Sequence, residues 1–482
     1  MAIRTAQIAP CLQENFIALD AMAQADLVRR GEVSPLELVD AAIARIESLN
    51  PQINALASSD FALARGKALA ASSHGVLAAV PTLIKDLLAY PGLRLERGSR
   101  LFKGHMAEVI SPYAEALGRA GLIALGKTTT SELGLLGTTE TLACGATRNP
   151  WDLSRSSGGS SGGAAAAVAS GMVPVAHASD GGGSIRGPGS FCGLFGFKPS
   201  RGRTLAADVP PTLPTAGLLS EHCLSRSVRD SAAWLAITER NDPEAPFAPL
   251  GMLTEPPRNR LRIGVYRQDV FGRDPEPAAL AALEHACRLC REIGHEIVEV
   301  AAPRYAPDAP KNAFFLLTGA VLAGTFDFLQ QAMGPAFRPE LAEPYTLELI
   351  RRAAQSSPAQ LVQAQKALAS GQLIAEQSMA SFDLLLCPTV ADVAFPLQRY
   401  RPTDAADKLI AFTESVAGYT VIASVAGWPA MSIPLYRNAD GLPLGSHFAA
   451  PCGREDLLFG LAYQLEQAAD WGNDWPDLLA EV

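Results

Sequence analysis

One segment restricts the possible folds more than any other, because its pattern predicts two parallel strands joined by a helix. Residues 261–266 and 295–300 are apolar runs of strand length, and residues 277–293 between them carry apolar side chains at helical spacing. Parallel neighbours need a long crossover of this kind, whereas antiparallel neighbours need only a short turn. The sequence therefore predicts an α/β fold with a mixed, mostly parallel central sheet and helices on both faces.

Other segments extend this pattern along the chain. The predicted helices span residues 21–30, 35–49 and 455–470, and the predicted buried strands span residues 121–126, 382–388 and 429–434. Ser34 is a good N-cap for the second helix, and Pro35 suits its first position. Between these elements, residues 149–199 are dominated by glycine and serine, so local propensity explains this stretch least well.

The domain organisation predicted from this pattern has two parts. Residues 1–20 form an N-terminal extension, and residues 21–482 form one large domain. The parts of that domain are the core motifs at 76–205, the strand–helix–strand unit with a helical insert at 260–380, and the C-terminal part at 381–482.

Composition excludes several classes of function. The net charge of the 482 residues is −9 and no block of lysine and arginine occurs, which argues against a nucleic-acid partner. The uncharged runs at residues 162–179 and 419–436 are rich in alanine, glycine and proline and lack the sustained apolarity of a membrane span, so we expect no membrane partner. The first residues contain no apolar signal-peptide core, so we expect a cytoplasmic protein. The oligomeric state stays open, with a homodimer among the candidates.

The eight cysteines predict free thiols and no metal site. They stand far apart, at positions 11, 144, 192, 223, 287, 290, 387 and 452, and a chain of this length does not need disulfides for stability. Cys287 and Cys290 form a C-x-x-C pair, but they lie in a predicted helix, and no second cysteine or histidine pair stands at metal-binding spacing.

Two formal motif matches fail on physical grounds. Residues 121–128 fit a phosphate-binding loop ending in Lys127, but the residues between the two glycines are themselves a predicted apolar strand. Residues 158–162 fit the G-x-S-x-G pattern of Ser-His-Asp hydrolases, but residues 151–157 are not the apolar strand that this motif requires. The histidines that could complete such a triad, His295 and His447, stand in settings typical of structural histidines.

A third constellation is far more specific. It comprises Lys85 within the run 80–86, the glycine, serine and alanine run 156–168, and the segment 180–188, which contains three glycines followed by Ser184. In these residues and in their spacing the chain resembles the amidase signature family. Ser160 stands 75 positions after Lys85, and Ser184 stands 24 positions after Ser160, as in that family. The resemblance extends to residues 145–152, 426–434 and 441–443, and it implies the amidase signature fold.

The resemblance implies a role for each of three side chains. Ser184 is the nucleophile, Ser160 relays its proton from a cis peptide bond after Gly159, and Lys85 is the base. Burial next to apolar residues should lower the pKa of Lys85 by the roughly two units that a base near pH 8 requires.

The glycines before the nucleophile suggest a second function for the backbone. In a glycine run, successive N–H groups can converge on one oxygen without interference from Cβ atoms. We expect the N–H groups of Gly181, Gly182, Gly183 and Ser184 to form the oxyanion hole.

These residues predict an amide hydrolase that acts on a small molecule and needs no cofactor and no metal. Within the family the chain looks most like the bacterial stand-alone amidases, which include cyclic-amide, nylon-oligomer and aryl acylamidase types. Leu135 and Gly137 lie in an apolar stretch where the family places substrate-binding residues, so we expect an uncharged linear, cyclic or aryl amide. The alternative is the glutamine-hydrolysing component of a tRNA-dependent amidotransferase, which would work inside a complex.

Overall fold

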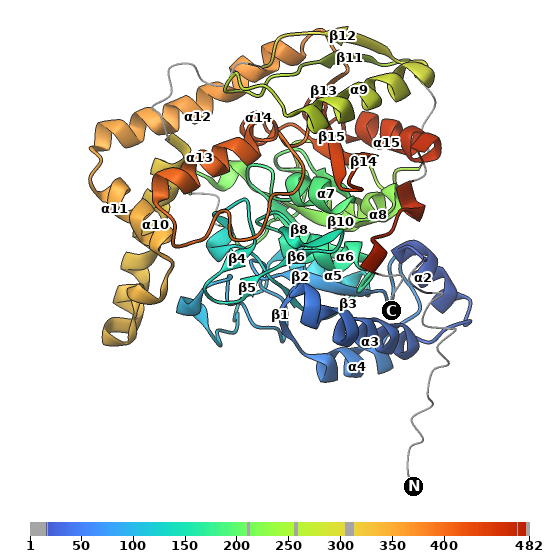
Figure 1. The fold of residues 1–482 in the computed structure, drawn as a ribbon. Helices are drawn as coiled ribbons and strands as arrows, with labels where there is room; N and C mark the ends of the chain where they lie inside the picture. The colour runs from blue at the N-terminus through green and yellow to red at the C-terminus, as the bar shows by residue number, and fades with distance from the viewer. Residues whose placement is uncertain are drawn as a thin grey trace.

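The computed structural model describes residues 16, 18–209, 213–254, 259–303, 313–469 and 471–478. Its centre is an eleven-stranded sheet, with β1 to β3 toward the lower side of Figure 1 and β11 and β12 at the top. In spatial order the strands are β1 (Leu56–Ser59), β3 (Ile123–Thr128), β2 (Pro81–Lys85), β8 (Val175–Asp180), β10 (Ser220–Ser225), β9 (Phe195–Lys198), β14 (Ala430–Arg437), β15 (Pro443–Ala449), β13 (Leu384–Pro388), β11 (Arg262–Val265) and β12 (Glu296–Glu299). Two small hairpins lie outside this sheet: β4 (Glu140–Thr141) with β5 (Gly145–Ala146), and β6 (Arg148–Asn149) with β7 (Asp152–Ser156).

Parallel and antiparallel pairing occupy different parts of the sheet. The groups β3–β2–β8 and β13–β11–β12 pair in parallel. The other neighbouring strands of the described sheet pair antiparallel, including β8 with β10 and β14 with β15. The prediction of a mixed sheet in one α/β domain is confirmed, with more antiparallel pairing than expected. One reason is that only residues 438–442 join β14 to β15, and so short a turn permits antiparallel pairing alone.

Helices cover both faces of the sheet, as the sequence predicts. The described α-helices are α2 (Ala21–Arg29), α3 (Pro35–Ile53), α4 (Phe61–Leu69), α5 (Pro112–Arg119), α6 (Gly162–Ala169), α7 (Arg186–Cys192), α8 (Val228–Thr238), α9 (Pro277–Glu292), α10 (Ala313–Met333), α11 (Pro344–Ala354), α12 (Pro358–Met379), α13 (Ala406–Ala417), α14 (Val421–Ala426) and α15 (Glu455–Ala469). Successive side chains of β3 point to opposite faces: Ile123 and Leu125 pack in the core under α3 and α6, and Ala124 packs in the core under α5 and α8.

The same alternation holds at the other end of the sheet. Leu384 and Leu386 of β13 lie in the core with α9 and α15, whereas Leu385 and Cys387 lie in the core with α12 and α14. The predicted strand–helix–strand unit is confirmed as β11, α9 and β12, whose two strands pair in parallel from Arg262 opposite Glu296 onward.

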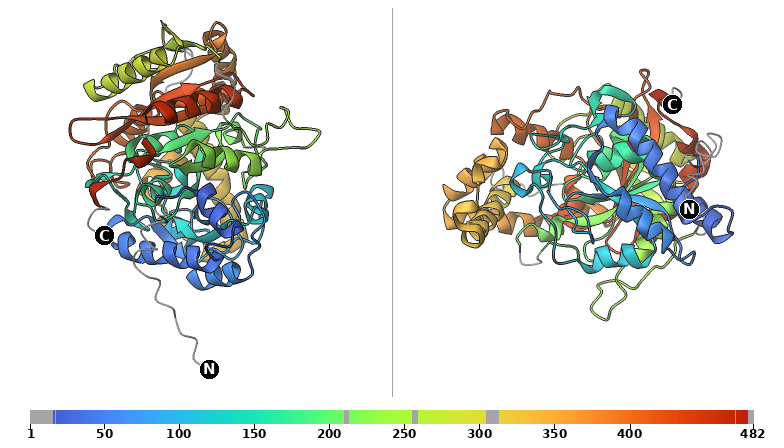
Figure 2. Two further views of the ribbon diagram at one scale, coloured as in Figure 1. Left: turned by 90° about the vertical axis from the view of Figure 1, so that its right-hand side faces the viewer. Right: turned by 90° about the horizontal axis from the view of Figure 1, so that it is seen from below.

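Helices α10, α11 and α12 form a layer beside the sheet, seen at the left of Figure 1 and of the right-hand view in Figure 2. By length and composition, residues Ala313–Ala336 could cross a membrane. In the fold, one side of this helix buries Phe315, Leu322 and Phe326 against its neighbours. The same helix also forms a wall of the cavity described below, and these three residues line that cavity too. Packing and the cavity wall together account for the apolar composition of the helix.

Most element boundaries agree with the sequence prediction. Helices α2, α3 and α15 begin at the predicted residues, and the Ser34 and Glu37 side chains form a complete capping box on α3. The predicted strand at 121–126 is displaced to 123–128, which places Lys127 inside β3. Among the described residues the seven cysteines are free thiols, and the eighth, Cys11, lies outside them.

Candidate active site

A large cavity lies between the sheet and the α10 layer. Its volume is about 2060 Å³, and its wall includes Ser160, Ser179 and the loop of residues 181–184. Leu135 and Gly137 line the same cavity. The structure thus places two of the three predicted catalytic residues, the predicted oxyanion loop and both predicted substrate-binding residues around one space.

Lys85, the third predicted catalytic residue, lies directly behind this wall. It ends β2, where its side chain is fully buried. Its Nζ atom lies 2.7 Å from Ser160 Oγ, 2.8 Å from Ser161 Oγ and 3.0 Å from Ser179 Oγ. Its contact with Ser160, which the family resemblance implies, is therefore direct.

The surroundings of Lys85 change its proton affinity. Burial disfavours the charged ammonium and lowers the pKa of Lys85 to about 7, while the Glu221 and Asp180 carboxylates partly oppose this shift. At neutral pH a substantial fraction of Lys85 is therefore uncharged and able to accept a proton.

Lys127 is a second buried lysine near the site, but it has a different setting. Its Nζ atom donates hydrogen bonds to the backbone oxygens of Lys85 and Leu88. Burial lowers its pKa to about 8. Within the described residues, the hydrogen bonds of the Lys127 side chain go to backbone oxygens alone, so Lys127 braces the end of β2 from its place in β3.

Close packing explains why residues 156–168 are almost all glycine, serine and alanine. The peptide bond between Gly159 and Ser160 is cis. A Cβ atom on Gly159 would lie 2.5 Å from the Thr138 backbone nitrogen, so no larger residue fits there. The alanines that follow form α6, which is fully buried between the sheet and α3. Small residues are therefore needed to hold Ser160 in the wall of the cavity.

Residues 152–156, just before this run, form a strand, but it is not the apolar strand that the G-x-S-x-G motif requires. This strand, β7, pairs with β6 outside the central sheet, and most of its residues are only partly buried. It therefore lacks the buried setting in the main sheet that the nucleophile motif of Ser-His-Asp hydrolases needs.

The loop that carries Ser184 is held by buried polar contacts. The Asp180 carboxylate accepts hydrogen bonds from the Gly183 and Ile185 N–H groups at 2.7 and 3.1 Å, and it pairs with the Arg186 guanidinium at 2.8 Å. Burial alone would raise the pKa of Asp180, but Arg186 brings it well below its usual range. The carboxylate therefore stays ionised and anchors the loop.

Gly183 cannot be replaced in this loop. Its φ angle is +137°, and a Cβ atom would lie 2.3 Å from Thr420 Oγ1. Thr420 Oγ1 also donates a hydrogen bond to the Gly182 oxygen at 2.6 Å, which fixes the loop from the opposite side.

The same contacts refine the predicted oxyanion hole. Because the Gly183 N–H already donates to Asp180, it is not available for an oxyanion. In the described part of the chain, the N–H groups of Gly181, Gly182 and Ser184 donate to no protein acceptor. All three of these residues line the cavity.

The apolar wall around Leu135 contains one acidic residue that faces away from the cavity. Glu132 is buried and accepts hydrogen bonds from Ser99 Oγ at 2.5 Å and from the Glu343 N–H at 2.8 Å. Its carboxylate thus joins this wall to α11, and Leu135 packs beside the apolar core of α10 and α13.

The two candidate histidines lie in structural settings. His295 accepts a hydrogen bond from the Leu261 N–H through Nδ1 and contacts Gln464 through Nε2. His447 is fully buried between Arg186 and Cys387. Neither histidine lines the cavity that contains Ser160 and Ser184.

Sequence reasoning missed two features of the site. Ser179 contacts Lys85 and was not singled out; its place one residue before the end of β8, beside β2, is a tertiary fact. Arg97 lines the cavity, although the sequence predicted no charged group there. A weak signal for Arg97 existed in its closeness to Lys85 along the chain.

Comparison with known proteins places this geometry in context. A family model described as Amidase matches residues 37–459. The chain is 38% identical over 458 residues to the protein named "Putative amidase AmiC" of Mycobacterium leprae, and the match covers 94% of this chain and 96% of that protein.

Two solved structures are similar over nearly the full length. The structure of a 6-aminohexanoate cyclic dimer hydrolase complexed with substrate has a TM-score of 0.88 and 32% identity, covering 96% of this chain and 99% of that chain. A bacterial aryl acylamidase has a TM-score of 0.84 and 28% identity, with the same coverage. The range matched by the family model, residues 37–459, includes the loop of residues 181–184 and the lysine behind it.

Proposed function

Because the chain belongs to the Amidase family, and its named relatives include hydrolases of non-peptide amides, we propose that it cleaves carboxamides through an acyl-serine intermediate. In this proposal Ser184 is the nucleophile, Ser160 the proton relay and Lys85 the base. The observation that supports it best is the 2.7 Å contact between Lys85 Nζ and Ser160 Oγ in a setting that lowers the pKa of Lys85 to about 7.

The contacts of Lys85 support one direction of proton flow. The Ser161 hydroxyl donates its proton to the backbone oxygen of Ser179 at 3.2 Å, so Ser161 Oγ accepts a hydrogen bond from Lys85. Neutral lysine has two N–H groups and one lone pair. With its N–H groups directed to Ser161 and Ser179, its lone pair is left for the hydroxyl proton of Ser160.

The proposed reaction follows from this arrangement. Ser184 Oγ attacks the amide carbonyl as its proton passes to Ser160, whose own proton passes to Lys85. The N–H groups of Gly181, Gly182 and Ser184 stabilise the oxyanion, and the proton returns through Ser160 to the departing nitrogen as the C–N bond breaks. Water then attacks the ester by the same route, which releases the acid and restores Ser184.

Replacing the relay tests the proposal directly. In Ser160→Ala we expect amide hydrolysis to fall about 10³-fold or more, because the leaving amine must be protonated. Hydrolysis of p-nitrophenyl esters should fall much less, since that leaving group needs no proton. The measurement is kcat for a matched anilide and p-nitrophenyl ester of one acid. An equal loss for both substrates would contradict the relay role of Ser160.

We also propose that the group entering the cavity beside Leu135 is aliphatic or aromatic. Leu135→Asp should raise KM for neutral anilides by about tenfold or more and change kcat less, because it places an unpaired carboxylate against the guest. Leu142→Asp is the matched control, since Leu142 is exposed and does not line the cavity. Equal KM values for the two variants would show that Leu135 does not contact the substrate.

The predicted alternative, the glutamine-hydrolysing component of an amidotransferase, is tested with the same enzyme. Glutamine would bring a charged ammonium group against this apolar wall. We therefore expect kcat/KM of the isolated chain for neutral anilides to exceed that for glutamine by about 10²-fold, corresponding to several buried methylenes. A preference for glutamine would support the alternative.

A further inference from the structure

Arg97 occupies an unusual place in the wall of the catalytic cavity. It lies between β2 and the short helix Arg100–Phe102, in the left-handed region with φ +55°. Its backbone oxygen accepts a hydrogen bond from the Leu133 N–H at 2.9 Å. The residue after Leu133, Gly134, approaches Ser160 so closely that a Cβ atom there would lie 3.5 Å from Ser160 Oγ. Arg97 is therefore tied to the same piece of wall as the proposed relay.

The guanidinium of Arg97 has no acceptor among the residues that the structure describes. The two nearby carboxylates are engaged elsewhere: Asp86 accepts from the Glu96 and Gly98 N–H groups, and Asp208 accepts from the Ala89 N–H at 2.5 Å. The contact that the guanidinium does make is with the Phe102 ring, whose centroid lies 5.7 Å away. A ring face accepts no conventional hydrogen bond, whereas a carboxylate can accept hydrogen bonds from two of the five N–H groups of an arginine.

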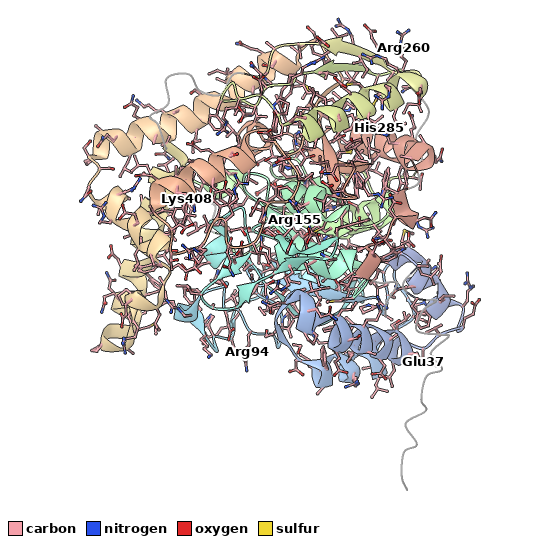
Figure 3. All side chains as sticks on the ribbon, viewed as in Figure 1. Glu37, Arg94, Arg155, Arg260, His285 and Lys408 are labelled. Atoms are coloured by element: carbon pink, nitrogen blue, oxygen red, sulfur yellow. The ribbon has the colours of Figure 1, made fainter. Side chains whose placement is uncertain are left out.

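A nearby arginine, Arg94, has different surroundings from Arg97. Arg94, labelled at the lower edge of the molecule in Figure 3, is exposed and lies 3.7 Å from a Glu96 oxygen. Arg97 is partly withdrawn from solvent, and this burial lowers its pKa, while the Asp208 and Asp86 carboxylates partly oppose the shift. A guanidinium removed from water without an acceptor is costly, and a planar anion that accepts two parallel hydrogen bonds would offset that cost.

The rest of the cavity restricts the kind of anion. The remaining charged side chains in its wall are Lys103, His105, Glu108, Asp208, Glu221 and Glu414. Lys103, His105 and Glu108 are exposed, so the more enclosed charges are those of Arg97 and three carboxylates. Acidic surroundings of this kind repel a dianion such as a phosphate monoester about twice as strongly as a monoanion, and a single guanidinium matches a single carboxylate.

We propose that Arg97 binds a carboxylate on the substrate, at a distance from the amide that is cleaved. This inference rests on the proposed function. In place of the uncharged amide expected from the sequence, it names the substrate class as amides that carry a carboxylate group separated from the scissile bond by an apolar spacer. Arg97 is then a specificity-determining residue: it holds the substrate and takes no part in the proton transfers. The apolar wall at Leu135 accommodates another part of the same molecule.

Two series of matched anilides test the proposal on the full-length enzyme. In the first, monoanilides of succinic, glutaric, adipic and pimelic acids are compared with anilides of alkanoic acids of equal chain length. In the second, N-acyl aminobenzoates are compared with N-acyl anilines, which moves the carboxylate to the amine side. We expect wild-type kcat/KM to favour the carboxylate at one spacing by about 10- to 100-fold, mainly through KM.

Variants connect this preference to Arg97. Arg97→Gln should remove the preference while hydrolysis of the neutral anilides continues, which also shows that the variant folds. Arg97→Lys should keep part of it, and Arg94→Gln, the surface control, should keep all of it. Adipate and benzoate should inhibit the wild type competitively and inhibit Arg97→Gln at least about tenfold more weakly.

The outcomes separate this inference from the function on which it rests. If the wild type hydrolyses neutral anilides but prefers no carboxylate in either series, the carboxylate site is wrong and the proposed function stands. Equal losses for anionic and neutral substrates in Arg97→Gln would also overturn it. If no anilide is hydrolysed at all, the proposed function fails and the inference fails with it.

Discussion

Ser184→Ala is expected to abolish amide hydrolysis, with kcat reduced about 10⁴-fold or more, while the fold is retained. The variant removes the atom that forms the acyl-serine bond, and removal of a nucleophile costs most of the rate enhancement of such an enzyme. Ser184 is only half-buried, and its hydroxyl makes no hydrogen bond within the described residues, so stability should change by about 0.5 kcal/mol or less.

Covalent labelling provides an independent measurement of the same residue. A fluorophosphonate should add one phosphonyl group to the wild-type chain with loss of fluoride, and peptide mass spectrometry should locate the group on Ser184. Ser184→Ala should remain unlabelled, whereas Ser154→Ala, a change at an exposed serine outside the cavity, should be labelled at the wild-type rate. Labelling of another residue in the wild type would assign the nucleophile elsewhere.

The second large effect is expected at Lys85, together with a change in pH dependence. Only neutral Lys85 can accept a proton, and its pKa is lowered to about 7. We therefore expect wild-type kcat/KM to rise about tenfold per pH unit well below pH 7 and to level off above it. Lys85→Met keeps an apolar stem of similar length but has no amine to accept a proton. It should therefore lower the rate about 10²- to 10⁴-fold and flatten this rise.

Lys127→Met is the matched control for this experiment. Lys127 is equally buried and its pKa is lowered to about 8, but its Nζ atom contacts only the backbone oxygens of Lys85 and Leu88. This variant should lose stability, because the buried carbonyls of Lys85 and Leu88 each lose one hydrogen bond, and it should keep the rise of rate with pH. If instead Lys127→Met flattens the profile and Lys85→Met does not, the base has been assigned to the wrong lysine.

The fold class was predictable because it depends on local patterns. The strand–helix–strand unit at β11, α9 and β12 shows its periodicity over one short stretch of chain, and Ser34 with Pro35 marks the start of α3 without help from distant residues. The directions of the central strands were less predictable. The pairing of β10 between β8 and β9, for instance, depends on contacts between segments far apart in the sequence.

The candidate site divides in the same way. The residue types at Lys85, Ser160 and Ser184, with the glycines between and around them, are legible in the sequence, because activated hydroxyls, a desolvated base and close backbone approach each need particular side chains. Long-range packing decided the remaining features: the contact of Ser179 with Lys85 across neighbouring strands, and the use of the Gly183 N–H by Asp180.

Arg97 shows the limit of sequence reasoning most clearly. In the sequence it is one arginine among several in a polar stretch, and Arg94 looks equivalent to it. Only the tertiary structure separates the two, because it turns Arg94 outward and brings Arg97 against the cavity wall through the Leu133 hydrogen bond. Local patterns determine which residues can perform a chemistry, whereas burial and the availability of partners, which decide where a charge must find a ligand, exist only once the chain is folded.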